Sequence, residues 1–243
     1  HTVPVFIKTT KNRPSMNSKR IRLWDLPTRL FHWLLVLSVG AAVVSGQLGG
    51  KLIDWHGKIG LLVVGLITFR LVWGLLGSTY ARFANFLPTP GVIKAYLRGE
   101  WRGHGLNPLG ALSVLGLLAL LAGQVITGLF SNDDIAFTGP LAALVGNDLS
   151  NRLTGIHHLL SNLLIGLVIL HVGAIVFYGH VRKQKLLKPM VTGWGEGDGL
   201  SATGGGLLAF VVALVVALGA GYGASGVWLP KPPPPSAVET PNW

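Results

Sequence analysis

The chain has 243 residues, a formal net charge of +11 and no cysteine, and half of its residues are hydrophobic. Without cysteine it forms no disulfide, thiolate metal site, iron–sulfur cluster or covalently attached c-type haem. The apolar composition, with only 12% charged residues, argues against an ordinary soluble domain and indicates a membrane protein. The positive charge raises nucleic-acid binding as a competing interpretation, which the distribution of the charges must decide.

Five stretches are long and apolar enough to cross a bilayer core, which takes about 20 residues of helix. They cover residues 28–48, 55–76, 106–130, 155–178 and 205–227. Between them, residues 78–105 predict a segment lying on the membrane surface, and residues 131–154 a mildly acidic loop. The fold class expected is an all-α membrane protein, in which a four-helix transmembrane bundle is joined by a fifth transmembrane helix.

The domain organisation follows from these stretches. We expect a polar cytoplasmic tail, a four-helix domain, the fifth helix and a proline-rich outer tail, at residues 1–21, 22–195, 196–229 and 230–243.

Lysine and arginine are distributed unevenly between the two sides of the predicted spans. Fifteen lie on the side of the N-terminus and four on the other side, while Arg70 lies within the second span. The positive-inside rule therefore places the N-terminus in the cytoplasm and the C-terminus outside. The basic charge is explained by topology, and no nucleic-acid partner is expected.

Four histidines lie within or beside the predicted spans, where ionisable groups are costly and usually functional. Given the direction of each span, His56 and His157 lie near the outer side, and His32 and His171 near the cytoplasmic side. On the fourth span, 14 residues separate His157 from His171, about 21 Å along a helix, and both point to nearly the same side. The histidines thus form an outer and an inner pair.

Two imidazoles facing each other across a bundle are the axial ligands that a haem iron needs. Zinc fits less well, because its sites generally use three or four protein ligands, whereas copper is compatible with two imidazoles. The alternative for each histidine is a hydrogen-bonded packing residue or a proton relay. His158 points about 100° away from its neighbour, which leaves it for contact with a haem propionate or a quinone.

Two arginines lie at the level of the inner pair. Arg70 follows His56 by 14 residues, and Arg29 precedes His32 by one turn. A haem propionate would neutralise either guanidinium, and snorkelling to lipid headgroups is the alternative. Five tryptophans near the span ends are expected to be interfacial anchors, namely Trp24, Trp33, Trp55, Trp73 and Trp228.

Four motifs in order carry a resemblance to a known family. They read LWDLPTRLFHWLLV, WHGKIG with FRLVWGLLGS behind it, NPLGALSVLGLLALLAGQVITGLFSNDDI, and HHLLSNLLIGLVILH. Over residues 22–195 the chain resembles the bacterial cytochrome b561 family, which includes the b-type cytochrome subunits of nickel–iron hydrogenases. The resemblance implies a bacterial inner-membrane protein with two b haems, ligated through His32, His56, His157 and His171. His158 stands where members commonly have glutamate.

The resemblance also implies electron transfer between membrane quinone and a partner redox protein, either a c-type cytochrome, a dehydrogenase or a hydrogenase. The chain would then be an electron-transfer subunit in membrane lipid and no independent catalyst. One alternative is a stand-alone superoxide:quinone oxidoreductase, and another is a haem-free transporter with a histidine proton relay. Three aspartates of the outer side either attract a basic cytochrome c or are simply solvated, namely Asp133, Asp134 and Asp148.

Overall fold

The computed structural model describes residues 20–101, 106–196 and 199–230, so the two predicted tails fall almost entirely outside the described residues. Within this part, five helices are long and apolar enough to span a membrane, as predicted. They are α1 (Leu26–Leu48), α2 (Ile53–Leu76), α4 (Pro108–Phe130), α5 (Asn147–His180) and α7 (Leu207–Ala224).

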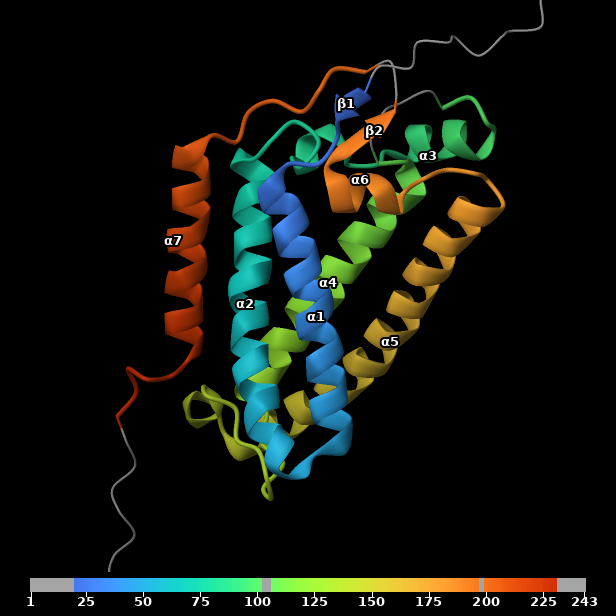
Figure 1. Ribbon diagram of the computed structural model, residues 1–243. Coiled ribbons are helices and arrows are strands. Elements are labelled where there is room, and N and C mark those ends of the chain that lie inside the picture. Colours follow the sequence, from blue (N-terminus) through green and yellow to red (C-terminus); the bar gives the residue numbers. More distant parts are fainter. Residues whose placement is uncertain (1–19, 102–105, 197–198, 231–243) are drawn as a thin grey trace, which may run out of the picture.

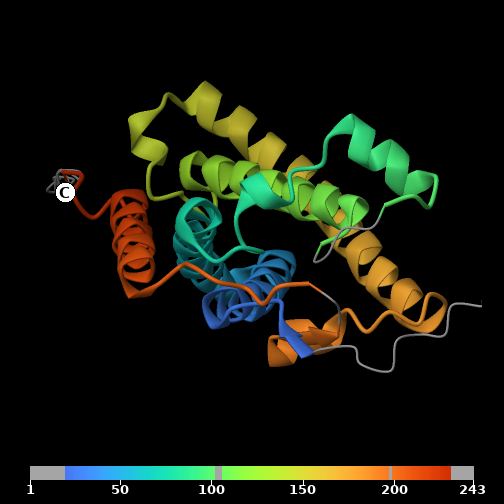
Figure 2. The same ribbon diagram turned by 90° about the horizontal axis from the view of Figure 1, so that it is seen from above.

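The long helices are arranged in two layers. One layer holds α1 and α2, with α7 against the far side of α2, and the other holds α4 and α5 (Figures 1 and 2). The layers meet mainly where α2 packs on α4. Successive long helices run in opposite directions (Figure 1). The helix bounds therefore place His32 and His171 towards one end of the bundle, and His56 and His157 towards the other.

Short elements cover the end of the bundle where α1 begins (Figure 1). They are β1 (Arg20–Arg22), which pairs antiparallel with β2 (Trp194–Glu196), and the helices α3 (Pro90–Leu97) and α6 (Leu187–Thr192). The strand pair was not predicted from the sequence. It arises because chain outside the spans must satisfy its backbone groups, as when the N–H groups of Leu23 and Trp24 donate to the carbonyl of Gly193.

Two segments between the spans differ in how well they were predicted. The expected surface segment contains α3, which begins at Pro90 and is capped by the Thr89 side chain. Helix α5 begins eight residues earlier than expected, inside the segment predicted as a loop. The Ser150 hydroxyl donates to the carbonyl of Phe130, and Asp148 lies in the first turn, where a helix favours negative charge.

The fifth helix packs on α2 through small side chains. Ala213 and Ala217 are buried there, and a Cβ at Gly65 of α2 would lie 3.7 Å from the carbonyl oxygen of Ala217. Small residues let helix backbones approach closely in a membrane, where dispersion contacts replace hydrophobic burial as the source of stability. This contact positions α7 on the flank of the bundle, away from α5 (Figure 2).

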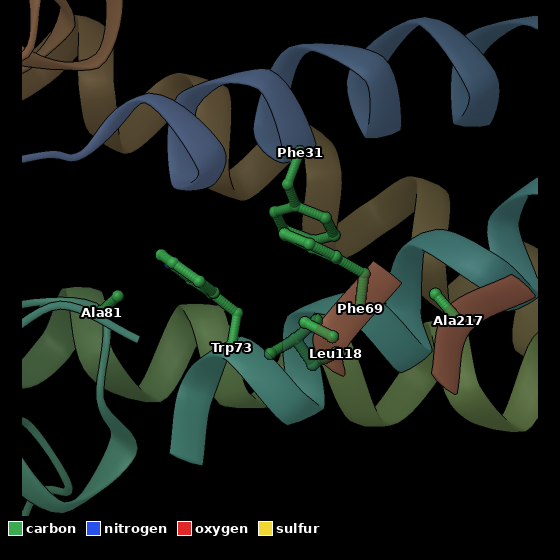
Figure 3. Packing of buried hydrophobic residues seen from close by; sticks show 7 residues of the cluster. Phe31, Phe69, Trp73, Ala81, Leu118 and Ala217 are labelled. Carbon is green, nitrogen blue, oxygen red and sulfur yellow. The ribbon is translucent and has the colours of Figure 1, made fainter. Parts of the chain in front are cut away.

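The largest buried cluster joins α1, α2, α4 and α7 (Figure 3). The rings of Phe69 and Trp73 stack with centroids 5.9 Å apart, and Phe31 of α1 reaches the same cluster. Trp73 is only 2% exposed. The prediction that Trp73 is an interfacial anchor is therefore wrong. Its position one turn from a helix end suggested exposure, but the sequence does not show that other segments of the chain cover it.

A buried carboxylate holds this end of the bundle together. Asp25 is 7% exposed and caps α1 by accepting the N–H of Thr28 at 2.7 Å. Its second oxygen accepts the indole N–H of Trp73 at 3.1 Å and the hydroxyl of Ser78. One side chain thus joins the start of α1 to the end of α2.

We expect Asp25→Ala to lower the free energy of unfolding by about 2–4 kcal/mol, because it removes a helix cap and leaves the Trp73 and Ser78 donors buried without an acceptor. Thermal or denaturant unfolding of the detergent-solubilised protein measures this loss. Glu100→Ala, at an exposed position, is the matched control. Equal stability of the two variants would contradict the role assigned to Asp25.

Candidate functional site

The four predicted histidines come from three helices. His32 lies on α1, His56 on α2, and His157 and His171 on α5, and all four side chains are partly buried. His158 is exposed on the next position of α5, although its ring lines the same pocket as His157.

The outer pair meets directly. The ring centroids of His56 and His157 lie 6.1 Å apart, with the ring planes nearly perpendicular at 82°. Both rings line one pocket, which takes residues from α1, α2, α4 and α5. Its cavity volume is about 190 Å³, below the roughly 300–1,000 Å³ common for ligand pockets. The outer pair therefore lies in a small cavity between the helices.

Hydrogen bonds fix the tautomer of both outer imidazoles. His56 Nδ1 lies 2.8 Å from the carbonyl oxygen of Ala42, and His157 Nδ1 lies 3.0 Å from that of Gln124. A carbonyl only accepts, so each Nδ1 carries the proton and each Nε2 keeps its lone pair. A metal-binding histidine usually donates the hydrogen of its other ring nitrogen to a backbone carbonyl, a carboxylate or water.

Two glycines make room for these rings. A Cβ at Gly46 of α1 would lie 3.0 Å from His56 Nδ1, and a Cβ at Gly128 of α4 would lie 2.9 Å from His157 Cε1. At these distances any larger side chain would displace the imidazole. The close approach of the helices to both rings therefore depends on glycine.

Helix α4 carries no predicted ligand but makes further contacts with His157. The Gln124 side-chain amide nitrogen lies 3.0 Å from His157 Nε2, and the Thr127 hydroxyl lies 3.2 Å from Nδ1. Thr127 donates its own hydrogen to the carbonyl of Gly123 at 2.8 Å, so it accepts from the imidazole. Sequence reasoning missed both residues, although a glutamine within an apolar span is the kind of signal that marks a membrane site.

The inner pair is less tightly arranged. In the described part of the chain, the rings of His32 and His171 make no contact like that of the outer pair. His171 Nδ1 lies 3.1 Å from the Ser113 hydroxyl, whereas His32 Nδ1 is buried and has no hydrogen-bond partner. A buried ring nitrogen without a partner is costly, which suits a site completed by another group.

The two predicted arginines make contacts with the protein itself. Arg29 donates from Nη1 to the carbonyl of Val191 at 2.6 Å, and its buried Nε has no partner. Arg70 is 5% exposed, donates to the carbonyl of Ala81 at 3.1 Å and lies over the ring of Phe83. Arg29 thus keeps one unused donor near α6, and Arg70 packs beneath the segment that follows α2.

The donor groups occur in pairs. Among residues 20–101, 106–196 and 199–230, no group of three or more histidine, cysteine, aspartate or glutamate side chains is placed to hold a metal ion. A haem, whose porphyrin supplies four of the six ligands to iron, needs only two protein ligands. The outer pair, with its fixed tautomers and glycine-lined approach, fits that requirement.

The fold and the outer pair define a class, a multi-pass helical membrane protein with a histidine pair inside its bundle. A model of the prokaryotic cytochrome b561 family matches residues 23–193, most of the chain. The chain belongs to that family. No curated protein and no solved structure matches it. Family membership makes the chain a membrane b-type cytochrome of electron transfer, and it implies binding of b-type haem.

The acidic loop at the outer end is ordered by one of its aspartates. Asp133 Oδ1 accepts the backbone N–H groups of Phe137, Ile135 and Ala136 at 2.8, 3.0 and 2.8 Å. These hydrogen bonds hold the pKa of Asp133 below its ordinary value. Its stabilisation of the loop is therefore present above the ordinary aspartate pKa and is lost as pH falls through the lowered value.

We expect the amide signals of residues 135–137 to shift together in an NMR pH titration, below the ordinary aspartate pKa of about 3.9. Protonation of Asp133 weakens the three hydrogen bonds at once. Asp133→Asn, which accepts a hydrogen bond but has no proton to gain, removes the common transition. A shared transition at or above pH 3.9 would contradict this account.

Proposed function

We propose that the protein is a di-haem cytochrome b that transfers electrons between the quinone pool and a partner redox protein across the bacterial inner membrane. The proposal goes beyond the membrane b-type cytochrome of electron transfer that family membership gives. The observation that carries it is the outer pair, His56 and His157, whose rings lie 6.1 Å apart in one pocket.

The ring spacing supports ligation of one iron by both residues. A metal–imidazole bond is about 2 Å long, and the ligating nitrogen lies roughly 1 Å from the ring centre, so two such ligands in line have centroids about 6 Å apart. The fixed tautomers leave Nε2 as the ligand atom of both rings. Ligation at His157 Nε2 would replace its hydrogen bond with Gln124.

We assign a second haem to His32 and His171. The support is the shared level of the two residues near the opposite end of the bundle, together with the unpartnered Nδ1 of His32. Helix α5 carries one ligand of each pair, and the 14 residues between them rise by about 21 Å. Redox centres at two levels give electrons a route through the membrane.

A b haem supplies reversible one-electron transfer at its iron. The protein's own residues have three tasks in this proposal. The imidazoles hold the iron, the carbonyls of Ala42 and Gln124 keep Nδ1 protonated, and the apolar helices exclude water. Arg29, with its unused Nε, and Arg70 remain our candidates for contact with the propionates.

Topology and partners complete the proposal. The excess of basic residues on the side where α1 begins supports a cytoplasmic N-terminus and a periplasmic C-terminus. We propose quinone as the lipid-soluble substrate, and a c-type cytochrome, dehydrogenase or hydrogenase as the redox partner. The domain boundaries at residues 22–195 and 196–229 make the fifth helix an addition to the di-haem bundle.

The four ligand assignments are tested by alanine substitution. We expect His56→Ala and His157→Ala to remove the same component from a redox titration of the b-type α band, and His32→Ala and His171→Ala to remove the other. His180→Ala, at an exposed position of α5 outside the pocket, is the control that keeps both components. Two separately paired sites would be contradicted if each of the four ligand variants lost both components. They would also be contradicted if all four variants kept both components.

Co-purification tests the partner role. We expect the chain, extracted from its native membrane in mild detergent, to carry a second redox protein in a fixed ratio. A stand-alone superoxide:quinone oxidoreductase would instead purify alone and reduce quinone with superoxide as donor. That result would replace the subunit role while leaving the haem assignment in place.

A further inference from the structure

The loop between α4 and η3 (Ala142–Leu144) turns back towards the outer pair. Asn132 and Thr138 pair across it as an isolated β-bridge, and the N–H of Asp133 donates to the carbonyl of Phe137 at 3.1 Å. The Asp133 carboxylate closes the same turn by accepting the N–H of Phe137 at 2.8 Å. Phe137 is therefore held from both its N–H and its carbonyl.

The ring of Phe137 reaches the site of the outer pair. It meets the His56 imidazole edge to face, with centroids 6.3 Å apart and planes at 89°. It also rests on Gly57 of α2, where a Cβ would lie 3.1 Å from ring atom Cε2. Phe137, Asp133 and Gly57 all line the pocket that contains His56 and His157.

The side chains of the loop differ sharply in exposure. Ile135, at its tip, is 94% exposed, whereas Phe137 is partly buried in the pocket. Phe137 points inward from the polar loop, and its ring packs on Gly57 and against His56. The missing Cβ of Gly57 leaves room for the ring. The glycine and the carboxylate together fix where this ring lies.

We propose that Phe137 is the cover of the outer site, a positioning residue that shields the His56 side of the pocket from water and small solutes, and that Asp133 holds it closed. This inference rests on the proposed function, because the shielded group is the outer haem. An apolar shell around a metal site limits solvent access and lowers the local dielectric, which disfavours the more highly charged oxidised state.

The test compares variants of the purified full-length protein. We expect Phe137→Ala to lower the midpoint potential of the component that His157→Ala removes, and to raise several-fold its rate of oxidation by ferricyanide, because the site is then open to water and small solutes. The other component is unchanged. Ile135→Ala, in the same loop with an exposed side chain, is the matched control and behaves as the wild type.

Two further variants separate shielding from folding. Phe137→Leu retains an apolar side chain over the site, so we expect a rate of oxidation by ferricyanide between those of the wild type and Phe137→Ala. If Phe137→Ala loses the outer haem, the comparison of Phe137→Leu with the wild type tests the shielding. Asp133→Ala reproduces the direction of Phe137→Ala because it frees the loop, whereas Asp133→Asn, which still accepts a hydrogen bond, has a smaller effect.

The cover is overturned if the Phe137 variant that retains both haems has the wild-type potential and oxidation rate. The proposed function is contradicted by a different result, namely that His157→Ala removes no component from the redox titration of the b-type α band. The two failures are distinguished in the same titration.

Discussion

An imidazole within a membrane needs a partner for each of its ring nitrogens, and the arrangement of the bundle depends on this requirement. At the outer site, carbonyls of α1 and α4 accept the Nδ1 protons of His56 and His157. The helices come close enough to do so because Gly46 and Gly128 have no side chain there. Nε2 of each ring then keeps its lone pair, although that of His157 has a hydrogen bond with Gln124 which a ligand would replace. This is the basis on which we propose axial ligation rather than packing or a proton relay.

The two ends of the bundle hold these helices in different ways. At the end where α1 begins, the buried Asp25 joins α1 to α2, and the β1–β2 pair and α6 cover the helix ends (Figure 1). At the other end a single loop, organised by Asp133, reaches back over the pocket. The ring of Phe137, from this loop, contacts the imidazole of His56.

The five long helices could be predicted from the sequence, because membrane spans are read from hydropathy. The same reasoning paired the histidines by level, and the rings of His56 and His157 do meet. Long-range contacts had no such signal. The carboxylate of Asp25 accepts from residues about 50 positions away, so Trp73 was wrongly assigned to the interface. The sequence did not single out Phe137, because the position of its ring depends on the conformation of the loop. It also did not predict where α5 begins, because the polar residues before the span still form helix.

The central claim is that one chain holds two b haems. The most direct measurement is the ratio of haem to protein in the purified, detergent-solubilised wild type, with haem extracted as its pyridine complex and protein quantified by amino-acid analysis. The account predicts two non-covalently bound b haems per chain, both reducible and both with the low-spin spectrum of two axial imidazoles. A ratio of one, or protein that folds fully without haem, would contradict it.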